Sequence, residues 1–162
     1  MRIFFSLLCF LAFTALSAQS TMPSVEVKTL KGKTVNLQDY ANNGKITVFS
    51  FWATWCAPCK RELDAIAEIY PDWVDEYDVE VVAVTIDTRQ QLSKVPAMVQ
   101  SKQWDYIVLS DAQGAAQQAL NFQAIPQTFV TDQNGNIIYS HSSYVPGDEY
   151  ELEDKIKAAA GK

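Results

Sequence analysis

The sequence predicts one compact α/β domain. A near-continuous apolar run at 46–52, typical of a strand covered on both faces, is followed from Pro58 by a helical pattern of about twenty residues. A β-branched run at 79–86 then supplies a second buried strand. Strand, helix and strand in this order form a βαβ unit, whose crossover is expected to be right-handed. The length of 162 residues suits a single domain.

Residues 1–18 have the features of a signal peptide. Arg2 provides a short positive segment, residues 3–13 form an apolar core, and small residues precede a cleavage point near Ala18. The segment is short for a membrane span, so an uncleaved anchor is the less favoured alternative. We therefore expect a periplasmic or otherwise extracytoplasmic domain over residues 19–162.

Composition excludes several classes of function. Without Arg2 the chain has 12 basic and 19 acidic side chains, a net charge of −7 with no basic cluster, so nucleic acid is not an expected partner. Cys9 is lost with the signal segment, which leaves Cys56 and Cys59. A zinc site would need two more ligands, and the only histidine, His141, lies in a polar segment typical of a surface residue. We expect no metal and no cofactor.

The N-terminal part of the domain is predicted to be a β-hairpin. Residues 25–30 and 34–37 alternate between apolar and polar side chains, and residues 31–33 supply the turn between them. A polar loop at 42–45 then leads to the buried strand at 46–52. One face of this hairpin is therefore expected to be buried.

The remaining elements are predicted from turn and capping signals. Pro71 is expected to kink or break the helix that begins at Pro58. Ser110 and Asp111 are suitable caps for a helix rich in alanine and glutamine. In order, the later elements are a loop and helix at 87–102, a strand at 106–109, a helix at 112–120, a hairpin at 128–140 and a closing helix at 148–160.

The two cysteines lie where a buried strand meets the start of a helix. Unpaired N–H groups and the helix dipole favour an anion at this position, so the thiol pKa of Cys56 should be lowered. Pro58 is tolerated because it lies in the first turn, where no N–H donor is needed. Two residues between the sulfurs, Ala57 and Pro58, allow Cys59 to close a small disulfide ring. The pattern predicts a dithiol that is oxidised and reduced in turn.

The string Phe-Trp-Ala-Thr-Trp-Cys-Ala-Pro-Cys-Lys at 51–60 resembles the active-site signature of the thioredoxin superfamily. The signal peptide, the N-terminal hairpin and a Cys-X-Pro-Cys-X-X-Glu pattern ending at Glu62 are similar to its TlpA/ResA-like branch, over residues 24–160. This resemblance implies a thioredoxin-like fold, with a central mixed β-sheet flanked by helices on both faces. It also implies an extra helix between the second and third core strands.

The resemblance implies roles for several residues. Cys56, the more exposed cysteine, is the expected nucleophile, and Cys59, buried under Trp55 and Pro126, is the resolving cysteine. The family has a cis-proline opposite the dithiol, and Ile125-Pro126 matches it, although a proline opening a strand can also be an ordinary edge residue. By this match, the Ile125 backbone would contact the substrate.

Two carboxylates lie near the predicted site. Cytoplasmic thioredoxins have a buried aspartate where this chain has Ser50. Asp87, which follows the second core strand, is expected either to take part in proton transfer or to cap the next helix. Glu62 would approach the dithiol from the helix, but a solvated helix face is the favoured interpretation of its position.

We therefore expect a protein thiol-disulfide oxidoreductase, monomeric, that reduces disulfides in client proteins and is kept reduced by a membrane-embedded electron donor. Apocytochrome c is the kind of client that the resemblance implies. No histidine separates Cys56 from Cys59, which favours a reductant over a disulfide-introducing oxidase or isomerase. A peroxiredoxin-type thiol peroxidase is less favoured, because no proline of the Pro-X-X-X-Thr-X-X-Cys pattern precedes Cys56. A non-catalytic binding module would not need both cysteines.

Overall fold

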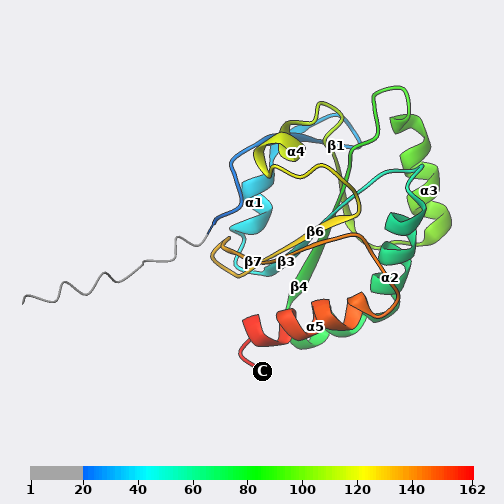
Figure 1. Cartoon of the computed structure of the whole chain (residues 1–162). Helices are drawn as coiled ribbons and strands as arrows, with labels where there is room; N and C mark the ends of the chain where they lie inside the picture. The colour runs from blue at the N-terminus through cyan, green and yellow to red at the C-terminus, as the bar shows by residue number, and fades with distance from the viewer. Residues whose placement is uncertain (1–19) are drawn as a thin grey trace, which may run out of the picture.

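The computed structural model describes residues 20–162, which build a seven-stranded mixed sheet with helices on both faces (Figure 1). The predicted signal peptide and Cys9 lie outside the described residues. Within 20–162, no helix has the length and apolar character needed to cross a membrane. In sheet order the strands are β2 (Thr34–Asn36), β1 (Glu26–Thr29), β5 (Ile107–Ser110), β4 (Val79–Thr85), β3 (Ile46–Trp52), β6 (Gln127–Thr131) and β7 (Ile137–Ser142).

The predicted βαβ unit is confirmed and forms the centre of the sheet. β3 and β4 pair in parallel, and helix α2 (Ala57–Tyr77) connects them. All seven residues of β3 are buried, which explains its unbroken apolar pattern. α2 continues through Pro71, so of the two predicted alternatives, a kink or a break, the break is wrong. The C-terminal end of β3 leads directly into α2, and this junction contains the two cysteines.

Helices cover the sheet in two layers. On one face, α1 (Leu37–Ala41) and α4 (Ala115–Ala119) contribute to a core with Phe49, Phe51 and Phe129. On the other face, α2 and α5 (Asp148–Ala159) enclose Ile46, Val48 and Val130. Alternate side chains of β3 therefore lie on opposite faces of the sheet. Positions 50 and 52 share the α2 face with 46 and 48.

The predicted hairpins and closing helix are confirmed. β1 and β2 form the N-terminal hairpin, and β6 and β7 form the second one. The extra helix between the second and third core strands is α3 (Val95–Lys102), which follows a short turn, η1 (Leu92–Lys94). The sequence pattern missed α1, which is only five residues long and begins after the N-cap Asn36. α4 is shorter than expected because it begins after Gly114.

Candidate active site

Cys56 and Cys59 are joined by a disulfide bond at the start of α2. Cys56 is the N-cap residue, and its Sγ accepts a hydrogen bond from the Cys59 N–H at 3.3 Å. Ala57 and Pro58 open the helix between the two cysteines. Cys56 is 5% exposed and Cys59 is fully buried. The sulfur of Cys56 is therefore the one nearer to solvent, and it lies where the helix N-terminus stabilises negative charge.

Cys59 is buried in an apolar cluster shared by β3, α2 and α3. Its neighbours in this cluster include Trp52 and Leu63, both fully buried, and Trp104. Trp52 is thus a core residue, as the sequence indicates. Trp55, predicted to cover Cys59, is 59% exposed, so most of its indole faces solvent beside the dithiol.

The Ile125–Pro126 peptide bond is cis, as predicted. Ile125 is partly buried against the cluster that contains both cysteines. Gln127, which follows Pro126, pairs with Phe51 near the C-terminal end of β3. The cis-proline loop therefore lies at the same end of β3 as the dithiol. The cis-proline loop and the dithiol, about seventy residues apart in the sequence, therefore meet at the same end of the central strands.

Asp87 fixes the position of Thr54, in the segment that precedes Cys56. Its side chain is fully buried, and its Oδ2 accepts hydrogen bonds from the Thr54 N–H at 2.8 Å and the Thr85 hydroxyl at 2.7 Å. Oδ1 accepts a third bond, from the Thr54 hydroxyl at 2.8 Å. Lys60 adds a bond to the Thr54 carbonyl at 3.1 Å. The helix-cap interpretation of Asp87 is wrong, because the residue that precedes η1 as its N-cap is Gln91.

Glu62 lies in the interior, and the prediction of a solvated helix face is wrong. It is only 5% exposed, because its face of α2 packs against the sheet. Its Oε1 accepts a 2.7 Å hydrogen bond from the Thr128 hydroxyl, and Oε2 accepts one from Ser50 at 3.2 Å. Burial raises the pKa of Glu62 to about 7, although both hydroxyls oppose the rise. Glu62 follows Cys59 by one helical turn, which places both residues on the same buried face.

The structure adds residues that the sequence did not indicate. Thr128 and Ser50 bind the Glu62 carboxyl. His141, interpreted from the sequence as a surface residue, forms a hydrogen bond with Asp148, with 3.0 Å between Nε2 and Oδ2. It lines a small cavity together with Glu62. No local pattern signals this arrangement, because it depends on the pairing of β6 with β7.

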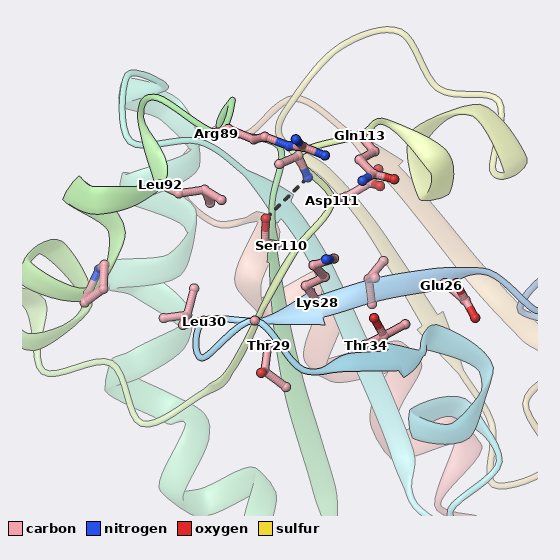
Figure 2. A pocket seen from close by; sticks show the side chains of 14 residues that line it. Glu26, Lys28, Thr29, Leu30, Thr34, Arg89, Leu92, Ser110, Asp111 and Gln113 are labelled. Atoms are coloured by element: carbon pink, nitrogen blue, oxygen red, sulfur yellow. Dashed lines mark hydrogen bonds between the residues drawn. The ribbon is translucent and has the colours of Figure 1, made fainter.

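A larger cavity of about 320 Å³ lies beside the N-terminal hairpin (Figure 2). Figure 2 shows Arg89 and Leu92, from the chain after β4, on one side and Lys28 and Thr34 of the hairpin on another. None of the predicted site residues lines this cavity. Within residues 20–162, no three His, Cys, Asp or Glu side chains are grouped as metal ligands.

Comparisons with known proteins agree with this geometry. Residues 18–140 match the AhpC/TSA family. The chain is 34% identical over 124 residues to the thiol-disulfide oxidoreductase ResA of Geobacillus kaustophilus, covering 76% of this chain and 68% of the relative. It is 31% identical over 135 residues to the thioredoxin-like protein YneN of Bacillus subtilis, covering 83% and 75%.

Solved structures show the same fold. A thioredoxin-like protein from Porphyromonas gingivalis superimposes with a TM-score of 0.77 at 42% identity, over 86% of this chain and 92% of that one. A thiol:disulfide interchange protein from Chlorobium tepidum superimposes with a TM-score of 0.70 at 23% identity, over 88% and 97%. At that lower identity the match concerns the fold alone.

Proposed function

Because the chain belongs to the AhpC/TSA family and is a thiol-disulfide oxidoreductase of the ResA type, we propose that its Cys56–Cys59 pair reduces disulfides in client proteins outside the cytoplasm. The observation that carries this proposal is the position of the pair, at the N-terminus of α2 and beside the Ile125–Pro126 loop. This position supplies a stabilised thiolate and an adjacent backbone surface for a substrate.

Cys56 is the proposed nucleophile. In the reduced protein its thiolate attacks one sulfur of a client disulfide, which forms a mixed disulfide and releases the other client sulfur as a thiolate. Cys59 then attacks the Cys56 sulfur, which closes the disulfide seen in the structure and releases the second client thiol. Two electrons pass to the client, and the thiol proton of Cys59 must be taken up by a base.

Glu62 is the base that the geometry favours for this proton. It lies one turn beyond Cys59 on the buried face of α2. Its pKa, raised by burial to about 7, allows it to accept and release a proton near neutral pH. Asp87 has a different proposed role, since its hydrogen bonds from Thr54 and Thr85 fix the chain directly ahead of the dithiol. It supports the loop that presents Cys56.

The client is proposed to bind across the exposed face of Trp55 and the Ile125–Pro126 loop. Trp55 supplies an apolar surface next to Cys56. Ile125 offers its backbone to an extended client segment, and Pro126 has no N–H that would compete. Ala57 and Pro58 complete the exposed turn between the sulfurs. Unfolded polypeptides such as apocytochrome c are the proposed clients.

The direction of electron flow is proposed from the residues between the cysteines. Ala57 and Pro58 carry no positive charge that would stabilise the reduced form, so the potential should be low. A donor in the membrane would then keep the dithiol reduced. The signal peptide predicted from the sequence at 1–18 supports this proposed extracytoplasmic placement.

The test is the reduction potential of the pair, measured on residues 19–162 in glutathione and dithiothreitol buffers. A value near or below roughly −270 mV supports a reductant, whereas a value near roughly −120 mV makes the protein a disulfide-introducing oxidant. A parallel assay follows reduction of a disulfide-containing protein by the wild type and by Cys56→Ser. Loss of turnover with retained client binding in that variant supports the assigned nucleophile, and unchanged turnover would contradict it.

A further inference from the structure

Glu62 is only 5% exposed, so its carboxyl has little contact with solvent through which it could exchange protons quickly. Its two oxygens are occupied by the hydroxyls of Thr128 and Ser50, and the side chain lies between α2 and the sheet. If Glu62 accepts the proton of Cys59, as the proposed function requires, this proton must leave before the next turnover. The protein therefore needs a route from Glu62 to the surface.

Glu62 lines a small cavity to which neither Cys56 nor Cys59 contributes. Its volume is about 10 Å³, which is enough for one water molecule. Polar groups line it, as a buried water requires, and they come from α2, β6, β7 and α5. The lining side chains are Glu62, Ile66, Thr128, Tyr139, His141, Tyr144, Asp148, Glu149 and Leu152.

Strand register places His141 beside this cavity. It is directly opposite Thr128 in the antiparallel pair of β6 and β7, so both side chains lie on the α2 face of the sheet. Thr128 in turn donates to Glu62. The His141 side chain is 29% exposed, so it contacts both the cavity and the solvent.

Asp148 orients the imidazole. Its Oδ2 lies 3.0 Å from His141 Nε2 and also accepts the Val145 N–H at 2.8 Å, which fixes the carboxylate at the start of α5. The Tyr139 ring stacks on the imidazole, with an interplanar angle of 7°. The ring is therefore held with one nitrogen committed to Asp148 and the other available.

The other titratable groups around the cavity are less suited to carry a proton. Burial raises the pKa of Tyr139 and of Tyr144 to about 12, so both phenols keep their protons at neutral pH. The Tyr144 hydroxyl donates to Glu149 at 3.0 Å, and Glu149 also accepts the Gly147 N–H. The imidazole of His141, by contrast, has two ring nitrogens, of which one can accept a proton while the other donates one.

We propose that His141, oriented by Asp148, is the relay through which the buried Glu62 carboxyl exchanges protons with solvent across the water-sized cavity. In the reducing direction, the Cys59 proton passes to Glu62, then through the cavity water to His141, and from the imidazole to bulk water. No electrons move in this relay. His141 does not touch the client, so it acts on the reaction only through Glu62.

The test compares wild type with His141→Ala and His141→Gln in single-turnover oxidation of the reduced protein by a disulfide peptide, at low buffer concentration between pH 5.5 and 8.5. Both variants are expected to be slowed about tenfold near pH 7, since a proton-transfer step then limits the rate. Asp148→Asn should be slowed less. Glu153→Gln is the matched control, because Glu153 lies on the same helix as Asp148, is similarly buried and pairs with Lys157, but does not line the cavity.

Added imidazole should restore the rate of His141→Ala in proportion to its concentration, whereas pyrazole, which has the same shape but is a much weaker base, should not. Equal rescue by both compounds would show that the histidine only fills space and would overturn the proposal. Wild-type rates and pH profiles in both His141 variants would overturn it too. In that case the oxidoreductase function would stand, provided that the wild type oxidises normally and Cys56→Ser does not react.

Discussion

Replacement of Glu62 by glutamine should remove a pH-dependent loss of stability. Below pH 4.5 the carboxyl is protonated in both the folded and the unfolded chain, so its raised pKa does not change the free energy of unfolding. Between pH 4.5 and about 7 the unfolded chain loses this proton while the folded protein keeps it, which favours unfolding. Above pH 7 the carboxyl is ionised in both states, and the loss of folding stability has reached its full value. Wild-type stability should therefore fall across this window, relative to Glu62→Gln.

The magnitude follows from the shift in pKa. A rise from 4.5 to about 7 corresponds to about 3 kcal/mol, at roughly 1.4 kcal/mol for each unit. Because Glu62 is only 5% exposed, solvent screens little of this energy. Glutamine has nearly the same shape, and its amide can still bond to the Ser50 and Thr128 hydroxyls. The difference between the two proteins should thus come mainly from charge.

Urea denaturation of the oxidised proteins at several pH values between 4 and 8 measures this difference. The disulfide prevents Cys56 and Cys59 from titrating, so the signal of Glu62 is isolated. The stability of Glu62→Gln relative to wild type should increase by about 3 kcal/mol from pH 4 to pH 8. Glu68→Gln, an exposed glutamate on the same helix, is the control. If the free energies of unfolding of wild type and Glu62→Gln changed with pH in parallel, the claim that Glu62 ionises in a buried site would be refuted.

Three further substitutions test the surroundings of the dithiol. Asp87→Asn should destabilise the protein by about 2 kcal/mol, because charge-assisted bonds to Thr54 are lost, and thermal unfolding would measure it. Trp55→Ala should change stability by less than about 0.5 kcal/mol yet raise the KM for protein clients, whereas Trp52→Ala should cost about 3–5 kcal/mol. A stability loss for Trp55→Ala as large as that for Trp52→Ala would contradict this assignment.

The parts of the structure that follow from local pattern could be predicted. The apolar run of β3, the helix after it and both hairpins have periodicities that the chain displays directly. The Cys56–Cys59 pair lies at a helix start for the same reason. The cis bond before Pro126 came from resemblance to a family motif, since a proline opening a strand does not specify its isomer.

The surroundings of Glu62 could not be predicted, because they depend on which face of α2 packs on the sheet. A glutamate among charged neighbours looks solvated, yet position 62 shares a face with Cys59 and Ile66. His141 depends on a still less local feature, its register opposite Thr128. A shift of one residue in that pairing would turn the imidazole to the other face of the sheet.

The point at which the chain enters the fold has a practical consequence. Met22 is fully buried, and its N–H donates a hydrogen bond to the Gly135 carbonyl. The Ile137 N–H donates one to the Ser20 carbonyl. The first described residues are therefore bound to the β6–β7 turn. This turn lies at the opposite end of β3 from Cys56, a separation of roughly 20 Å along the strand. Attachment ahead of residue 20, whether to a bilayer or to a sensor surface, would therefore leave the dithiol pointing outward and accessible to large clients.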